Sequence, residues 1–235
     1  MTSIDLNADL GEDCGDDAAL LEIVTSANVA CGAHAGSLQT MAATVRAASA
    51  HGVTIGAHPS FPDRANFGRI VMARAPEELF ADVVGQIRAL DAVARECGAR
   101  LRHVKAHGAL YNLAARDRCV ADVISRAVAA CDPTLAVVGL AGGEQLASAR
   151  AHGLRAIAEV FADRGYRDDG SLIPRGQPGA MIEDVDAAVA QAVGFAQSGA
   201  GQTICLHGDG PQALEFAQAI LHELRAQGIA VRSAV

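Results

Sequence analysis

The segment HVKAHGALYN, residues 103–112, carries three titratable side chains at every second position. If the segment forms a strand, His103, Lys105 and His107 share one face, because side chains two residues apart point the same way. An imidazole can move protons near neutral pH, and a lysine ammonium can hold an anionic oxygen. The row therefore predicts acid–base chemistry on a polarised substrate, with His103, deeper in the strand, as a supporting residue.

The same two-residue spacing places acidic and amide groups on one face of the first predicted strand. Asp5, Asn7 and Asp9 share that face, and the positions between them are apolar. Asp5 lies in mid-strand and fits a hydrogen-bonded structural acid as well as a ligand group. Further polar rows follow at later runs: Asn28 with His34, His58, then Glu159, Phe161 and Asp163, and finally Cys205, His207 and Asp209.

These polar rows belong to short apolar runs that alternate with Ala-rich helical patterns. Such alternation predicts βα units and a parallel sheet covered by helices. The polar faces must then line a barrel or crevice, near the carboxyl ends of the strands. The expected strands are 3–10, 23–30, 53–58, 101–107, 134–140, 154–163, 203–209 and 229–235, and the expected helices are 38–51, 76–98, 117–131, 143–152, 183–199 and 211–227.

Composition narrows the class of protein. The chain has 235 residues, which fits one α/β domain over 1–235, and its net charge of -8 argues against a nucleic-acid partner. The start lacks a secretory signal and no apolar run approaches the ~20 residues of a membrane span, so we expect a cytoplasmic protein. Six scattered cysteines indicate reduced thiols. Of these, Cys31 and Cys205 lie near polar motifs and stay candidates for ligand contact.

The longest irregular stretch is RGYRDDGSLIPRGQPGAM, residues 164–181. A connection of this length is more typical of a lid or binding loop than of a passive turn. Arg175 in this loop is a candidate for anion binding. Arg64, Arg69 and Arg164 also lie in loops, and solvated surface roles explain them equally well.

Eight segments, in order along the chain, resemble the motifs of the LamB/YcsF family. That family corresponds to the A subunit of the bacterial ATP-dependent 5-oxoprolinase. The resemblance implies a seven-stranded, deacetylase-like (β/α) barrel, ATP-coupled opening of 5-oxo-L-proline to L-glutamate, and two partners, subunits B and C. The segments are DLNADLGE (5–12), VTSANVACGAHAG (24–36), GAHPSFPD (56–63), FGR (67–69), HVKAHGALYN (103–112), EVFADRGY (159–166), PRGQPGA (174–180) and CLHGDGP (205–211).

The chain departs from the family pattern at four positions. Members usually carry aspartate at Ser37, arginine at Ile70, proline at Ala106 and asparagine at Gly210. Three of these positions lie beside candidate site residues, and whether they alter substrate preference or efficiency stays open at this stage. Oligomeric state cannot be read from these residues, and a homo-oligomer stays open.

A five-membered lactam is a stable amide, and phosphorylation of its carbonyl oxygen would create a better electrophile for water. We expect Asp9 or Glu159 to act as general base, His58 and His107 to transfer protons, and Lys105 to hold the anionic oxygen. The candidates for substrate or phosphate binding are Asn7, Asn28, His34, Asp163, Arg175, His207 and Asp209.

The route of ATP, expected with Mg²⁺, is open at this stage. The sequence has no G-x-x-x-x-G-K-[ST] motif and no G-x-G-x-x-G motif. The segment HGDGP, residues 207–211, is a candidate phosphate site because it leads into a predicted helix N-terminus. ATP could equally be used on one of the partners.

Two other functions compete with this hypothesis. A metal-dependent, deacetylase-like amide hydrolase would use Asp9, His34 and His58 as ligands, although the chain lacks a short H-x-x-x-H or H-E-x-x-H pair. A non-catalytic subunit that binds a small acid is the other alternative.

Overall fold

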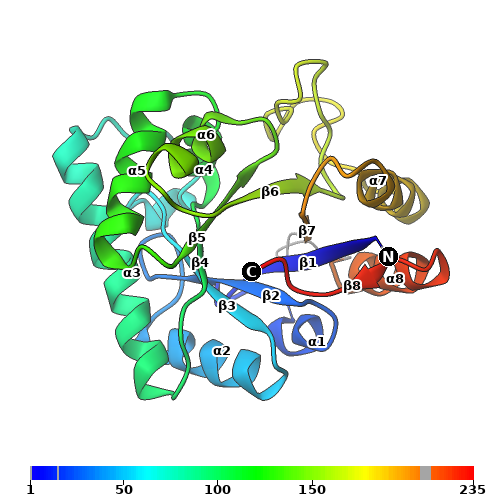
Figure 1. The fold of residues 1–235 in the computed structure, drawn as a ribbon, viewed down its shortest axis with the longest axis horizontal. Helices are drawn as coiled ribbons and strands as arrows, with labels where there is room; N and C mark the ends of the chain where they lie inside the picture. Colours follow the sequence, from blue (N-terminus) through cyan, green and yellow to red (C-terminus); the bar gives the residue numbers. More distant parts are fainter. Residues whose placement is uncertain (1, 15, 207–212) are drawn as a thin grey trace.

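The computed structural model describes residues 2–14, 16–206 and 213–235, which form a barrel of parallel strands surrounded by helices (Figure 1). The strands are ordered β2-β3-β4-β5-β6-β7-β1, and an additional β2–β1 pairing closes the ring. All of these pairings are parallel. The predicted seven-stranded (β/α) barrel is therefore confirmed.

The elements follow the predicted alternation. The barrel strands are β1 (Ser3–Leu10), β2 (Ser26–Ala30), β3 (Thr54–His58), β4 (His103–Lys105), β5 (Ala136–Leu140), β6 (Ala156–Phe161) and β7 (Thr203–Leu206), and β8 (Ala230–Val231) pairs with the outer edge of β1. The helices are α1 (Asp17–Leu21), α2 (Leu38–Ala50), α3 (Pro76–Glu96), α4 (Gly108–Ala114), α5 (Arg118–Cys131), α6 (Glu144–Ala151), α7 (Val185–Ser198) and α8 (Ala213–Ala226), with a short 3₁₀ helix η1 (Arg64–Asn66).

The fourth strand is shorter than expected. Its ladder covers only His103–Lys105, and the chain stays extended through His107 before α4 begins at Gly108. Gly108 has a φ of +56°, a left-handed conformation that permits this sharp turn into a helix the sequence pattern did not predict. Because the backbone stays extended to His107, Lys105 and His107 still share a face. The last strand is also shorter than expected, with only Ala230–Val231 paired.

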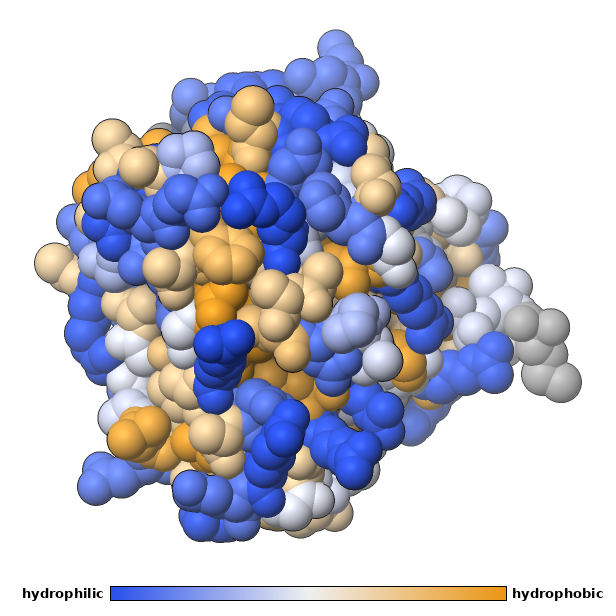
Figure 2. Space-filling model, turned by 60° about the vertical axis from the view of Figure 1, so that its left-hand side comes forward, coloured by the Kyte–Doolittle hydropathy of each residue, from blue (hydrophilic) through white to orange (hydrophobic). Residues whose placement is uncertain are grey.

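Each barrel strand is buried on both faces. In β1 the side chains of Leu6, Ala8 and Leu10 join the core between strands and helices, whereas Asn7 and Asp9 point into the barrel. Figure 2 shows the side that includes α3 and α5, where hydrophilic residues surround short stretches of apolar surface. Within the described ranges, no helix is both long enough and apolar enough to cross a bilayer.

Candidate functional site

The deepest polar group in the barrel is Asp5, which plays a structural part. Its carboxylate accepts hydrogen bonds from the hydroxyls of Thr25, Ser26 and Thr203 at 2.5, 2.6 and 2.6 Å. Burial raises the pKa of Asp5, and the three hydroxyl donors oppose that shift. The sequence left open whether Asp5 is a structural acid or a ligand group. Because three hydroxyls of the barrel wall donate to its carboxylate, Asp5 is a structural acid.

Above Asp5 lies a group that we call the lysine cluster: Lys105, Asp9, Glu159 and Cys205. The Lys105 ammonium is 2.9 Å from Asp9 Oδ1, 2.9 Å from Glu159 Oε1 and 3.1 Å from Cys205 Sγ. Burial alone would lower the pKa of Lys105, but the surrounding negative charges, led by Asp9, raise it well above its usual value. The ammonium therefore stays charged, and it faces two carboxylates.

Amide side chains tie the lysine cluster to the barrel wall. Asn7 Nδ2 donates to Glu159 Oε1 at 3.0 Å, and Asn28 Nδ2 donates to Asp9 Oδ1 at 2.8 Å and to Asn7 Oδ1 at 2.8 Å. These bonds fix both carboxylates in orientation, because each amide is itself buried and held by neighbouring strands. Strands β1, β2, β4, β6 and β7 all contribute to this layer.

His103, two residues before Lys105 on β4, supports that network. Its Nε2 lies 2.8 Å from Asn28 Oδ1, and burial lowers the pKa of His103 to about 3, so the ring is neutral and donates this bond. The ring occupies space left by Gly56 on β3, where any Cβ would overlap the imidazole. This position of His103 agrees with the supporting role predicted from the sequence.

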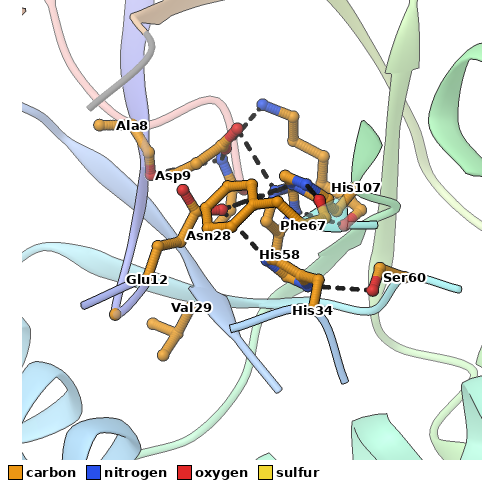
Figure 3. Close-up of polar contacts among 12 residues, drawn as sticks. Ala8, Asp9, Glu12, Asn28, Val29, His34, His58, Ser60, Phe67 and His107 are labelled. Carbon is orange, nitrogen blue, oxygen red and sulfur yellow. Dashed lines mark hydrogen bonds and ion pairs between the residues drawn. The ribbon is translucent and has the colours of Figure 1, made fainter. Parts of the chain in front are cut away.

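The carboxyl ends of the strands carry a second group, the histidine–carboxylate cluster: Glu12, His34, His58 and His107 (Figure 3). One ligand atom from each residue lies within 4.8 Å of the other three, and all four residues are buried. Glu12 Oε1 is 3.1 Å from His34 Nε2, 3.4 Å from His107 Nδ1 and 3.9 Å from His58 Nε2. His58 Nε2 and His107 Nδ1 are 3.0 Å apart.

Backbone and hydroxyl acceptors fix the tautomers of these histidines from outside the cluster. His58 Nδ1 donates to the Lys105 carbonyl at 2.8 Å, and His107 Nε2 donates to the Phe67 carbonyl at 2.8 Å. His34 Nδ1 is 3.0 Å from Ser60 Oγ, whose own hydrogen goes to the Phe61 carbonyl at 2.7 Å. Each ring therefore places its N–H outward. In the neutral form, each turns a lone pair into the cluster.

Burial also disfavours protonation in this cluster. It lowers the pKa of His34 to about 3 and shifts the pKa of His107 down further, and a positive charge on the neighbouring His58 would add to both shifts. Both imidazoles are therefore neutral at physiological pH.

The loop after β3 covers the cluster closely. Gly68 has a φ of +64°, and a Cβ there would lie 3.0 Å from His34 Cβ and 3.1 Å from His107 Cδ2. The Phe67 ring meets the His34 and His107 rings edge to face, with centroids 5.5 and 5.4 Å apart. The FGR segment, residues 67–69, therefore forms part of the wall around the cluster histidines.

Asp9 joins the two clusters. Its Oδ1 accepts from Lys105 and Asn28, while its Oδ2 lies 3.3 Å from His58 Nε2. Asp9 and Glu12 are 8% and 6% exposed, whereas Glu159 is fully buried. Asp9 is thus the better placed of the two predicted bases to meet a molecule that enters from the strand ends.

Most of the predicted site residues come together in these two layers. Asp163 follows β6 and is buried, and its charge contributes to raising the pKa of Cys205. Arg175 is exposed in the loop between β6 and α7, where its guanidinium contacts Met181 Sδ at 3.6 Å. His207 and Asp209, with the HGDGP segment and Gly210, lie outside the described residues.

The sequence analysis missed Glu12 and Ser60. Glu12 lies beyond the end of β1, where strand parity no longer applies, and Gly11 with a φ of +72° redirects the chain. Its place in DLNADLGE, three residues after Asp9, was the available signal. Of the predicted metal ligands, His34 and His58 lie in the histidine–carboxylate cluster and Asp9 borders it.

The irregular stretch 164–181 has structure of its own. Two isolated antiparallel bridges, Arg164 with Met181 and Tyr166 with Leu172, cross it. The Arg164 side chain is buried and donates to the Ala180 and Ile173 carbonyls at 3.0 and 2.6 Å. Arg164 therefore holds the loop together, and the loop extends beside the ends of β6 and β7 (Figure 1).

Of the departures from the family pattern, Ser37 has a clear structural role. Its hydroxyl accepts from the Thr40 backbone amide and caps α2, a role that aspartate also fills. Ala106 is buried between Lys105 and His107, and Ile70 is 53% exposed.

Comparisons with known proteins agree on family and fold. The model of the LamB/YcsF family matches residues 4–235. The crystal structure of a lactam utilization protein from Thermus thermophilus is 43% identical, covers 98% of this chain and 99% of its own, and superposes with a TM-score of 0.92.

More distant likenesses show the fold alone. A family 4 carbohydrate esterase from Streptomyces lividans, in complex with acetate, is 13% identical, with a TM-score of 0.53 and coverage of 100% of this chain and 93% of its own. The catalytic domain of a peptidoglycan N-acetylglucosamine deacetylase from Eubacterium rectale is 11% identical, with a TM-score of 0.59 and coverage of 100% and 89%.

Proposed function

The chain belongs to the LamB/YcsF family, and from this premise we propose that it is the A subunit of an ATP-dependent 5-oxoprolinase, which opens 5-oxo-L-proline to L-glutamate. The lactam utilization protein of Thermus thermophilus supports a lactam as the substrate class. The observation that carries the proposal is the buried Lys105 ammonium held by Asp9 and Glu159 inside the barrel.

The lysine cluster suits the ring opening of a small anionic lactam. Lys105 can hold a carbonyl oxygen as negative charge develops on it, which is where a preorganised cation contributes most. Asp9, at the more exposed edge, can take a proton from the attacking water. When the C–N bond breaks, the departing nitrogen needs a proton. Asp9 can return the proton that it took from water, and His58, 3.3 Å from Asp9, with His107 beside it, can relay that proton.

The amide side chains suit substrate recognition. Asn7 and Asn28 carry both donor and acceptor groups, which match the N–H and C=O of a lactam. In the structure these amides donate to the carboxylates of Glu159 and Asp9. A bound substrate would therefore replace some of these hydrogen bonds. His34, Asp163 and Arg175, with His207 and Asp209, stay proposed contacts for substrate or phosphate.

ATP, with Mg²⁺, enters the proposal as the source of the activating phosphoryl group. Transfer to the lactam carbonyl oxygen releases ADP and makes the ring carbon a better electrophile. Attack of water and cleavage of the C–N bond then leave an acyl phosphate, and a second water converts it to the carboxylate and inorganic phosphate. We assign no nucleotide site to the described residues, and partner subunits B and C complete the proposed assembly.

A reconstituted assay tests this function. Purified chain with subunits B and C, given 5-oxoproline and ATP, is expected to form glutamate and ADP together. Lys105→Met should abolish glutamate formation, because no other described cation lies between Asp9 and Glu159. His222→Gln, on an outward position of α8, is the matched control and should retain full turnover.

Two results would contradict the proposal. Full turnover by Lys105→Met would show that the lysine cluster is not the reaction site, and an intact assembly with that result would favour a non-catalytic subunit. Glutamate formation by the chain alone without ATP would favour the metal-dependent amide hydrolase.

A further inference from the structure

We propose that Glu12, His34, His58 and His107 form a binding site for one divalent transition-metal ion, with Zn²⁺ as the best match. The four side chains come from the carboxyl ends of β1, β2, β3 and β4 and point toward one another (Figure 3). Three imidazole nitrogens and a carboxylate oxygen are a donor set that zinc favours.

The strongest argument is the meeting of lone pairs. Because His58 Nδ1 donates to the Lys105 carbonyl, its Nε2 carries a lone pair in the neutral form. His107 Nδ1 is likewise an acceptor, since its Nε2 donates to the Phe67 carbonyl. These two acceptors are nevertheless only 3.0 Å apart in a buried site. A cation between them turns a repulsive contact into two favourable ones.

The third histidine repeats the pattern. Its Nδ1 hydrogen goes to Ser60 Oγ, so His34 Nε2 turns a lone pair toward Glu12 Oε1 at 3.1 Å. A proton on His58 Nε2 would relieve the contact with His107 but would leave this one unchanged. A single divalent ion accommodates both contacts at once, which favours the metal over a shared proton.

The spacing of the donors fits a tetrahedral ion. With zinc–ligand bonds of about 2.0–2.1 Å, tetrahedral geometry separates neighbouring donor atoms by about 3.3 Å. Four of the six donor separations are 3.0, 3.1, 3.4 and 3.9 Å and bracket that edge length, and the other two are at most 4.8 Å. Binding an ion therefore requires the side chains to draw closer together.

The surroundings are those of a metal site. Ligating histidines usually donate their other ring N–H to a carbonyl or another acceptor, which fixes the ring and raises its basicity. All three histidines do so here, and Gly68 lets the loop after β3 approach the rings closely.

The site would extend the proposed function, because Asp9 Oδ2 is 3.3 Å from His58 Nε2 and an ion there would stand next to the proposed base. A bound ion supplies a Lewis acid that can polarise a carbonyl or lower the pKa of water. The test below reads metal binding alone, so it can fail without the lactam proposal failing, and the reverse holds as well.

The experiment uses full-length chain stripped with chelator and titrated with Zn²⁺ by calorimetry, and with Co²⁺ followed by visible absorption. Wild-type protein is expected to bind one ion per chain with a tetrahedral Co²⁺ spectrum. Glu12→Gln should weaken binding by more than the roughly 10–100-fold that loss of an outer partner costs. Glu22→Gln, an exposed carboxylate at the end of α1, is the matched control and should bind as wild type.

Circular dichroism establishes that both variants fold, and the wild-type stoichiometry and Co²⁺ spectrum stand without either variant. The proposal is overturned if wild-type protein binds neither ion, if Co²⁺ binds with an octahedral, water-like spectrum, or if Glu22→Gln loses as much affinity as Glu12→Gln. In the first case a shared proton is the occupant of the cluster.

Discussion

The lysine cluster and the histidine–carboxylate cluster occupy successive layers of one barrel, but their charges are balanced in different ways. In the lysine cluster an ammonium meets carboxylates at 2.9 Å, so donor faces acceptor. In the histidine–carboxylate cluster, His58 Nε2 and His107 Nδ1, which are both acceptors when the two rings are neutral, lie 3.0 Å apart. Burial makes complementarity necessary in both. The first cluster contains its own cation, whereas the second is complete only with one supplied from outside.

The largest expected effect comes from removing the internal cation. Lys105→Met leaves Asp9 and Glu159 buried without it, so we expect unfolding free energy to fall by about 3–5 kcal/mol, measured by urea denaturation. Glu159→Gln in the same background removes one of the uncompensated charges and should recover part of the loss. A decrease below ~1 kcal/mol for Lys105→Met would show that the two carboxylates do not depend on the lysine.

The pH dependence of the free energy of unfolding tests the protonation state of His103. The pKa of His103 is lowered from 6.5 to about 3 in the folded protein, chiefly by burial. Between those values the unfolded chain binds a proton that the folded chain does not, so this contribution is present above pH 6.5 and is lost as pH falls toward 3. His103→Gln should flatten the stability curve there by up to about 1.4 kcal/mol per pH unit. An unchanged slope would contradict a neutral, buried His103.

Opposite responses to a carboxylate-to-amide change would sharpen the comparison further. In metal-free protein, Glu12→Gln offers an N–H donor to the His34 Nε2 lone pair, and we expect stability to rise by about 0.5–1.5 kcal/mol. Glu159→Gln removes a charge that Lys105 contacts and should lower stability by about 1–3 kcal/mol. Thermal or urea unfolding in chelator measures both. Equal losses in the two variants would remove the distinction between the clusters.

The smallest expected effect lies outside both clusters. Arg175 is exposed, and Arg175→Ala should change unfolding free energy by no more than about 0.5 kcal/mol. If it contacts substrate as proposed, KM for 5-oxoproline should rise while stability is unchanged. A stability loss above ~1 kcal/mol would place Arg175 with Arg164 among the residues that hold the loop.

Local patterns predicted the fold and the lysine cluster well. Alternating apolar runs and helices indicated the parallel barrel, and strand parity placed Asn7, Asp9 and Lys105 on inward faces because β1 and β4 are regular there. The histidine–carboxylate cluster was harder to predict. Glu12 and His34 follow strands β1 and β2, where Gly11 and Gly32 adopt positive φ and parity ends. Tautomers also depend on carbonyls from distant segments, which spacing alone does not reveal.

The residues allowed at Gly56 on β3 and at His103 on β4 depend on each other. The imidazole fills the volume that a side chain on Gly56 would need, and its Nε2 holds Asn28. Gly56→Ala is therefore tolerable only together with a smaller residue at 103, and that replacement takes away the donor to Asn28. Gly56 cannot gain a side chain while His103 is present, and changing both positions loosens the amide that orients Asp9. We therefore expect Gly56 and His103 to be retained together or replaced together in related sequences.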